Sequence, residues 1–290
     1  MPTSNAVPER IVLASDGGVA GQAAANWVAD RARHHAVDVE IVTVEELDWL
    51  PVGADESIYQ RKYVDVLAAV SKSLSNRHGV ALQEPSLLAG EPASEIVDAA
   101  AGADLLVIGS PRRADDTGAL HGTLALRIAA KISTRMAVVP AGWEAGEGSV
   151  VVGIDEDESS DAALQQAVSE ALRAGRELII VHAWSLPSPF SILDDLLGTT
   201  YPTLERIHRR ILRDAAARAT AIAPRLEVRT ILGFGRPSAL LASVARGESL
   251  LVVGHHHANR FQQFVLGSAT HGVLLASPVP VIVVPVAPTS

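Results

Sequence analysis

The sequence contains one pattern twice, and this duplication restricts the fold more than any other feature. In each copy a glycine follows an apolar run, and a Gly-Thr or Gly-Ser pair follows after an intervening loop. The first copy has Gly109 and Gly122-Thr123, and the second has Gly254 and Gly267-Ser268, 145 positions further along the chain. Repeat units of solenoid proteins are roughly 20 to 50 residues long. The pattern therefore indicates a duplicated domain.

The beginnings of the two halves also agree. Arg10–Ala14 precedes Asp16 as Val150–Ile154 precedes Asp155, and each run has the apolar character of a buried strand. Strand-like and helix-like segments then alternate through both halves, which favours right-handed crossovers and a parallel sheet. The sequence predicts an α/β fold of two tandem doubly wound, Rossmann-like domains. Each would be a mainly parallel five-stranded sheet with helices on both faces.

The periodicity of apolar residues places the elements within each half. In the first half we expect strands at 10–14, 39–44, 82–88, 105–109 and 136–140, and helices at 20–35, 57–78 and 123–132. A further short helix would begin at Pro92, with Ser94 as its cap. In the second half we expect strands at 150–154, 177–183, 227–232, 250–254 and 279–284, and helices at 159–174, 203–223, 238–246 and 268–275. A glycine-rich linker around Trp143 predicts domains 1–143 and 144–290.

The composition excludes several classes of protein. The chain has no cysteine, which rules out a disulfide scaffold and a thiolate metal site. Its net charge of −9 argues against a nucleic-acid binder, which needs a basic face. No apolar run approaches the roughly 20 residues that cross a bilayer, and the first residues lack the pattern of a signal peptide. We expect a cytoplasmic protein with neither nucleic acid nor membrane as a partner.

The glycine pairs predict a ligand site. A strand that ends in glycine, then a loop and a Gly-Ser or Gly-Thr pair that opens a helix, lets free N–H groups approach an anion. In doubly wound sheets, ligands lie beyond the carboxyl ends of the strands. Asp16 and Asp155 follow the first strand of each half, where a carboxylate can accept hydrogen bonds from a ribose or a base. Alternatively, the glycines form ordinary turns, and Thr123 and Ser268 cap helices.

These motifs resemble those of universal stress proteins. That family's pattern is an aspartate after the first strand, then Gly, two residues, Gly, nine residues, Gly-Ser/Thr and a Val-rich strand. The resemblance covers nearly the whole chain and implies binding of an adenine nucleotide, usually ATP, and regulation during stress rather than enzymatic turnover. The implied nucleotide-binding residues are Asp16, Gly109, Gly122 and Thr123 in the first half, and Asp155, Gly254, Gly267 and Ser268 in the second.

The chain departs from the family pattern at the second glycine. Arg112 stands there in the first half and His257 in the second. Each side chain can either offer a cation to a triphosphate or obstruct the backbone approach that a glycine allows. Two other functions therefore stay open: a nucleotide-free universal stress protein that acts as an interaction module, and a slow ATP hydrolase. No nucleophile–base pair is visible at readable spacing, so we expect no enzyme and no catalytic residues.

Three further expectations concern the surroundings of the sites. The segment Val181-His182-Ala183, at the end of the second strand of the second half, would carry the edge that binds the base. The acidic run Asp155-Glu156-Asp157-Glu158 would cap the next helix, or hold Mg²⁺ on a nucleotide. The run His255-His256-His257 predicts a polar loop over the ligand mouth and no metal site, since consecutive residues point in different directions.

The Val-rich final strands of the two halves predict how the domains associate. Val138-Val139-Pro140 and Val281–Pro285 would form exposed sheet edges, which need covering. Duplication supplies a partner within one chain, so we expect the two domains to pair intramolecularly. Homodimer formation stays open.

Overall fold

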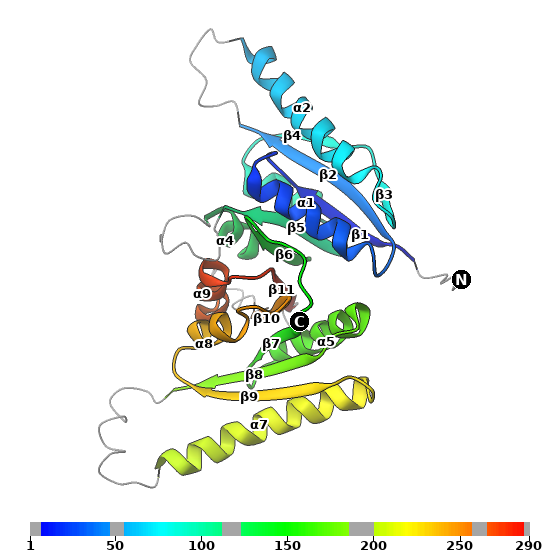
Figure 1. The fold of residues 1–290 in the computed structure, drawn as a ribbon. Coiled ribbons are helices and arrows are strands. Elements are labelled where there is room, and N and C mark those ends of the chain that lie inside the picture. Colours follow the sequence, from blue (N-terminus) through cyan, green and yellow to red (C-terminus); the bar gives the residue numbers. More distant parts are fainter. Residues whose placement is uncertain (1–6, 47–54, 112–122, 186–199, 257–265, 287–290) are drawn as a thin grey trace. The chain divides into compact units, whose positions relative to one another are not determined.

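A computed structural model provides the fold (Figure 1). It describes residues 7–46, 55–111, 123–185, 200–256 and 266–286. Three residues of the sequence motif, Arg112, Gly122 and His257, lie outside these ranges. The chain divides into two compact units, residues 1–145 and 146–290. The boundary expected from the sequence lay after Trp143.

Unit 1 is built on one parallel sheet. Its strand order is β3-β2-β1-β5-β6, and β4 pairs with β2 beyond the end of β3. The elements are β1 (Glu9–Ala14), α1 (Val19–Arg31), β2 (Val37–Glu45), α2 (Glu56–Leu74), β3 (Val80–Leu82), β4 (Ser86–Ala89), α3 (Pro92–Ala99), β5 (Leu105–Ser110), α4 (Thr123–Ala129) and β6 (Arg135–Pro140).

The single strand expected at 82–88 is wrong. The chain forms two short strands there, β3 and β4, which pair with successive parts of β2. Pro85 lies between them, and a proline has no N–H to donate to a ladder. The sequence expectation spanned this interruption because leucines lie on both sides of it, at Leu82 and at Leu87 and Leu88.

Unit 2 repeats the architecture with a five-stranded parallel sheet. Its strand order is β11-β10-β7-β8-β9. The elements are β7 (Val150–Ile154), α5 (Glu158–Ala174), β8 (Leu178–Trp184), α7 (Thr200–Ile222), β9 (Val228–Phe234), α8 (Pro237–Val244), β10 (Leu250–His256), α9 (Ser268–Ala276) and β11 (Val281–Val286). The fold class predicted from the sequence is confirmed.

The helices of unit 2 cover both faces of its sheet. Helix α5 packs against β7, β10 and β11, and α7 packs against β8 and β9. Helices α8 and α9 contact each other, α8 lies against β7 and β8, and α9 against β10 and β11. Right-handed crossovers put α5 and α7 on one face and α8 and α9 on the other, because the strand order reverses between β7 and β10. That reversal is where ligands bind in doubly wound sheets.

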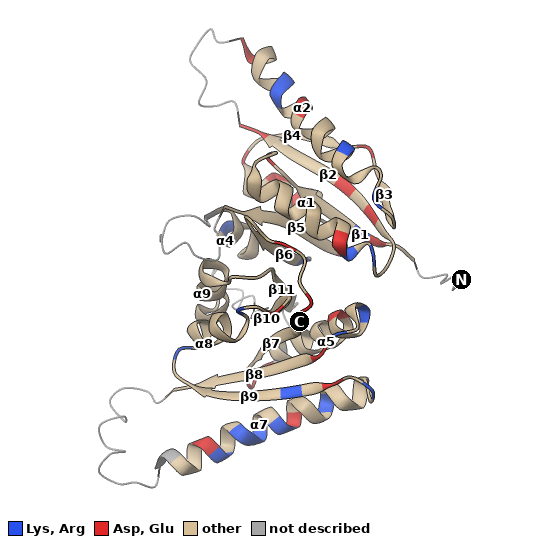
Figure 2. Ribbon diagram, in the orientation of Figure 1, with Lys and Arg blue, Asp and Glu red and all other residues tan. Residues whose placement is uncertain are grey.

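Aliphatic strands form the core of each unit, as the low aromatic content requires. Leu105, Leu106 and Val107 in β5 and Val150, Val151 and Val152 in β7 are all buried. Figure 2 shows charged residues of both signs along helices α2 and α7. A parallel strand covered on both faces must be apolar on both, which explains these continuous runs.

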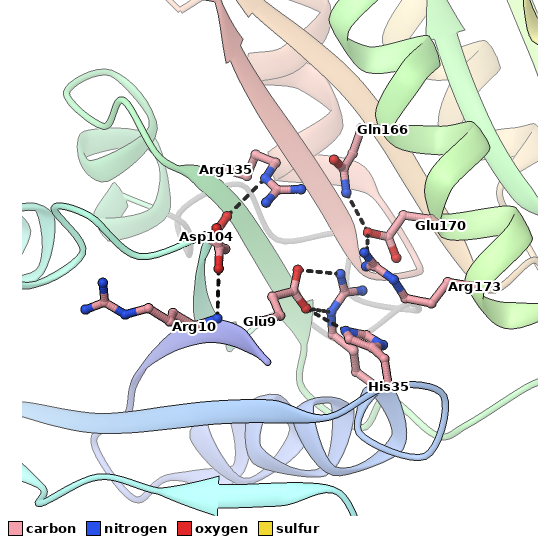
Figure 3. Close-up of polar contacts among 9 residues, drawn as sticks. Glu9, Arg10, His35, Asp104, Arg135, Gln166, Glu170 and Arg173 are labelled. Carbon is pink, nitrogen blue, oxygen red and sulfur yellow. Dashed lines mark hydrogen bonds and ion pairs between the residues drawn. The ribbon is translucent and has the colours of Figure 1, made fainter. Parts of the chain in front are cut away.

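A buried polar cluster closes the amino end of β1, away from the carboxyl ends of the strands (Figure 3). Glu9 accepts hydrogen bonds from Arg31 at 2.7 Å and 2.9 Å and from His35 Nε2 at 2.7 Å. Nearby, Asp104 accepts from the backbone N–H of Arg10 at 2.9 Å. In unit 2, Glu170 accepts from Gln166 at 2.6 Å. Such pairing is what allows charged groups to be buried.

The two Val-rich strands hold the sheet positions expected of them within their own units. Strand β6 ends the order of unit 1 and β11 ends the order of unit 2. Intramolecular pairing of the domains stays a prediction. None of the helices in the described residues has the length and apolarity needed to cross a membrane.

Candidate functional site

A cavity lies where the strand order of unit 2 reverses. Its volume is about 240 Å³, and it opens beyond the carboxyl ends of β7, β8 and β10. The starts of α5, α8 and α9 meet the same cavity. Its lining is formed by Gly153, Ile154, Asp155, Asp157, Ser159, Ser160, Val181, Ala183, Pro237, Leu241, Val253, Gly254, His255, Gly267, Ser268, Ala269 and Thr270.

The structure brings together five residues that the sequence assigned to the second site. Asp155, Val181, Gly254, Gly267 and Ser268 all line this cavity, although they come from β8, β10, α9, the loop after β7 and the loop before α9. The motif residue His257 lies outside the described residues. A parallel α/β sheet achieves this convergence because all its strands end at the same edge.

The acidic loop after β7 divides its carboxylates between two roles. Asp157 is the N-cap of α5, and its Oδ1 accepts from the N–H of Ser160 at 2.8 Å and from the hydroxyl of Ser159 at 2.7 Å. Capping of this helix was one of the two roles that the sequence predicted for the acidic run 155–158. Asp155 is exposed at the cavity, and within the part of the chain that the structure describes its Oδ1 accepts one hydrogen bond, from the neighbouring N–H of Glu156 at 2.9 Å. Of the two carboxylates that line the cavity, Asp155 is the one that does not cap α5.

Gly254 is required by the fold itself. A Cβ at this position would lie 2.6 Å from the carbonyl carbon of Ser159 and 2.7 Å from its hydroxyl oxygen. Gly109 has the same role in unit 1, where a Cβ would lie 2.8 Å from the N atom of Gly21. The first glycine of each motif therefore lets a strand pass close to the helix that follows the first strand. The close approach of a ligand is not needed to explain a glycine at these two positions.

Gly267 and Ser268 occupy a different environment. Both are exposed, and a Cβ on Gly267 would meet nothing within 4 Å. Gly267 is the N-cap of α9, which has no side-chain cap. The N–H groups of a helix's first turn have no partner within the helix, so those of α9 face the cavity as hydrogen-bond donors. Thr270 anchors this turn by donating its hydroxyl to the carbonyl of Gly254 at 3.0 Å.

The segment Val181-His182-Ala183, predicted as the base-binding edge, lies where the ladder between β8 and β7 ends. Val181 pairs with Gly153 on one side and Ile231 on the other, so its side chain is what it offers to the cavity. The ladder with β7 ends at the pair Ile154–His182, whereas the ladder with β9 continues to Trp184. Within the described strands, the free backbone edge on the β7 side begins at Ala183.

Sequence reasoning missed that His182, which it assigned to the base-binding edge, pairs with His208. His182 is buried, and its Nδ1 lies 2.8 Å from the carbonyl oxygen of Ile154. Since a carbonyl only accepts, Nδ1 carries the proton, and in neutral His182 the Nε2 atom accepts from Nδ1 of His208, also at 2.8 Å. His208 stacks on Trp184, with 4.8 Å between ring centroids.

Burial lowers the pKa of His208, and the neighbouring His182 lowers it further, while Asp155 and Glu156 raise it in part. The same arrangement exists without histidine in unit 1. There Thr43, which occupies the position of His182, donates its hydroxyl to the carbonyl of Ser15 at 2.6 Å. Comparing the two halves at this register could have shown His182 as a replacement for a polar anchor.

His255 and His256 do not form the loop that the sequence suggested, and His257 lies outside the described residues. Strand β10 extends through His255 and His256, which pair with Pro285 and Val286 of β11. His255 is buried and lines the cavity. The run of valines ends before these residues. The sequence therefore predicted a strand that ends at residue 254, whereas β10 ends at His256. Among the described residues, no group of three or more His, Asp or Glu could hold a metal ion.

The corresponding site of unit 1 is described in part. Asp16 is exposed after β1 and accepts from the N–H of Gly18 at 2.9 Å, and α4 begins at Thr123. Arg112 and Gly122 lie outside the described residues. At the start of α3, the cap is Glu91 and not Ser94 as expected. The N–H of Ala93 and the hydroxyl of Ser94 lower the pKa of Glu91 to about 2.

Comparison with known proteins agrees with the fold and the repeated motif. The model of the universal stress protein family matches residues 8–140 and 148–285. A universal stress protein of Mycobacterium tuberculosis is 27% identical over 286 residues, covering 94% of this chain and 96% of the relative. One of Mycolicibacterium smegmatis is 24% identical over 292 residues, covering 94% of this chain and 96% of the relative.

Solved structures show the same fold. A universal stress protein from Archaeoglobus fulgidus superposes with a TM-score of 0.67 at 18% identity, covering 94% of this chain and 95% of that chain. The family model matches each half of the sequence separately, with the two matches covering nearly its full length. The chain therefore belongs to the universal stress protein family and carries two of its domains in tandem.

Proposed function

We propose that the chain is a cytoplasmic ATP-binding regulator that binds the nucleotide in the cavity of unit 2. The observation that carries this proposal is the meeting of an exposed carboxylate, Asp155, with the open first turn of α9 in one cavity at the sheet's reversal point. A helix N-terminus favours anions through its free N–H groups and its dipole. The carboxylate suits the hydroxyl donors of a ribose. Together they match the two polar parts of a nucleotide.

The rest of the cavity suits the base. Val181, Ala183, Pro237 and Leu241 form an apolar wall on the side of β8 and α8. The free backbone edge that begins at Ala183 adds a donor and an acceptor next to this wall. In this proposal the base lies against the apolar wall, the ribose contacts Asp155, and the phosphates extend to Gly267 and Ser268. Mg²⁺ would accompany the phosphates.

Binding without turnover is part of the proposal. The cavity is lined by carboxylates, hydroxyls and His255, but the serine hydroxyls near Asp157 are engaged with its carboxylate. His182 is held by the carbonyl of Ile154 and by His208, so it supports the fold around the site. These contacts favour a site that holds a nucleotide over one that activates a nucleophile.

Calorimetric titration of the purified chain with ATP tests the proposal. Asp155→Asn should weaken binding by about tenfold or more, since a charged acceptor typically contributes ~1.5–3 kcal/mol. Asp98→Asn removes an exposed carboxylate of α3 and serves as the matched control. A folded wild-type chain that binds no ATP at millimolar concentration would refute the proposal and favour the nucleotide-free interaction module.

Two further measurements separate the rival functions. Denaturing the protein as purified and chromatographing the supernatant should release an adenine nucleotide. A Mg²⁺-dependent hydrolysis assay should show no turnover above the background rate. Sustained hydrolysis that Asp155→Asn removes would instead support the slow ATP hydrolase.

A further inference from the structure

Residues 91 and 236 occupy equivalent positions in the two units, 145 positions apart like the motif glycines. Each follows a glycine with positive φ, +143° at Gly90 and +123° at Gly235. Each is the N-cap of a helix that begins with proline, α3 in unit 1 and α8 in unit 2. The backbone therefore follows the same path, but the side chain is a glutamate in one unit and an arginine in the other.

Glu91 is fully engaged within unit 1. Its carboxylate accepts from the N–H of Ala93 at 2.9 Å and of Ser94 at 3.0 Å, which caps α3. It also forms ion pairs with Arg127 and, at 3.7 Å, with Lys131 of the α4 region. These local partners explain why the residue is an acid: Glu91 caps α3 and pairs with both Arg127 and Lys131.

Arg236 has none of these partners. A guanidinium has no acceptor and cannot cap, and α8 has no side-chain cap. The positions equivalent to Arg127 and Lys131 are Gly272 and Ala276. Arg236 is exposed, and among the described residues no ion pair or side-chain hydrogen bond involves it. Local structure therefore gives no reason for an arginine at the start of α8.

The position of Arg236 supplies a reason. It directly precedes Pro237, which lines the cavity at the start of α8. Helix α8 packs against α9, and a Cβ on Gly272 of α9 would lie 2.6 Å from Ser238, so the start of α8 borders the helix at which the phosphates are placed. The charged members of the cavity lining with described side chains are acids, Asp155 and Asp157. A polyanion entering this cavity needs a cation to offset them, and the planar guanidinium suits bidentate contact with phosphate.

We propose that Arg236 is a phosphate-binding residue of the site in unit 2. The inference rests on the proposed function, and it extends that function to a residue outside the glycine motif. It also assigns opposite roles to equivalent positions. Glu91 caps and stabilises α3 in unit 1. Arg236 leaves α8 without a side-chain cap and instead contacts the phosphates of the ligand.

Titrations with ATP, ADP, AMP and adenosine test this assignment. Arg236→Gln should weaken ATP binding by about tenfold, equivalent to about 1.4 kcal/mol, and leave the affinity for adenosine unchanged. The loss should shrink from ATP through ADP to AMP, and should diminish as salt screens the contact. Arg246→Gln, at an exposed arginine just beyond the other end of α8, is the matched control and should bind ATP like the wild type.

Arg236→Glu separates binding from stability. The new carboxylate can cap α8 as Glu91 caps α3, so the melting temperature should stay the same or rise while ATP binding falls further than in Arg236→Gln. Wild-type affinity for ATP in both variants would overturn the assignment and leave the proposed function intact. A wild-type chain that binds no adenine nucleotide would overturn both. Equal losses for ATP and adenosine would also overturn it, because they would indicate a structural role.

Discussion

Gly254 and Ser159 lie so close together that a Cβ on the glycine would approach the carbonyl carbon of the serine to 2.6 Å. The contact joins β10 to the start of α5, two elements far apart in the sequence. It separates the glycines of the motif into two kinds. Gly254 allows two parts of the backbone to pack, whereas Gly267 faces open space at the cavity.

The first prediction follows from this separation. Gly254→Ala should lower the free energy of unfolding by about 1–3 kcal/mol, because the neighbouring atom is backbone and cannot rotate away. Gly267→Ala should leave stability within about 0.5 kcal/mol of the wild type, since a Cβ has room there. Urea denaturation measures both. Equal stability of the two variants would contradict the structural role of Gly254.

The second prediction concerns the difference between the two sites. We expect unit 2 to bind ATP more tightly, because the motif loop of unit 1 contains Asp115 and Asp116 and that of unit 2 contains no acid. Each carboxylate near a triphosphate can cost up to about 1 kcal/mol at a solvated contact distance, so a several-fold to roughly thirtyfold difference is expected.

Calorimetry of two valine variants measures this difference. Gly267→Val should remove most ATP binding by filling the cavity next to the first turn of α9, and Gly122→Val should change little. Two sites of equal affinity, or the reverse pattern, would show that the acidic loop does not govern binding. Circular dichroism should show that both variants are folded.

The third prediction is a pH dependence of stability that arises at His208. Burial and His182 lower its pKa below 6.5, so the folded state disfavours the proton. The unfolded chain then binds more protons between the lowered pKa and 6.5, and this contribution to stability is lost as the pH falls through that window.

His208→Phe tests this dependence. The ring keeps an aromatic face for Trp184 but does not titrate, so unfolding free energy should fall less between pH 7.5 and 5.5 than in the wild type. The comparison concerns the slope, because the variant also leaves Nε2 of His182 without its partner. His34→Gln, at an exposed histidine, should keep the wild-type slope. An unchanged slope in His208→Phe would exclude His208 as the source.

The fourth prediction concerns recognition of the base. If the backbone edge at Ala183 binds adenine, ATP should bind more tightly than GTP, because the two purines present different donors and acceptors on their edges. A difference of about tenfold corresponds to one hydrogen bond lost or left unsatisfied. Competition of GTP against bound ATP measures it. Equal affinities would mean that the cavity holds phosphates and ribose without reading the base.

Much of the fold follows from local patterns in the sequence. The duplication, the Val-rich runs and the helical periodicity predicted two doubly wound units, since a parallel strand covered on both faces must be apolar throughout. The same patterns failed at two strand boundaries. Pro85 splits a predicted strand, and β10 runs on through His255 and His256 after its valines end.

The candidate site divides in the same way. By itself the sequence determined which residues follow each strand and open each helix, so Asp155, Gly254, Gly267 and Ser268 could be assigned together from their spacing. Only the tertiary structure decided what each does there. It gave Gly254 a packing role and Asp157 a capping role, because these depend on neighbours that the sequence pattern does not reveal. The spacing of residues along the chain predicts which of them lie at the ends of strands. Contacts between different elements form only when the sheet assembles, so the spacing does not predict them.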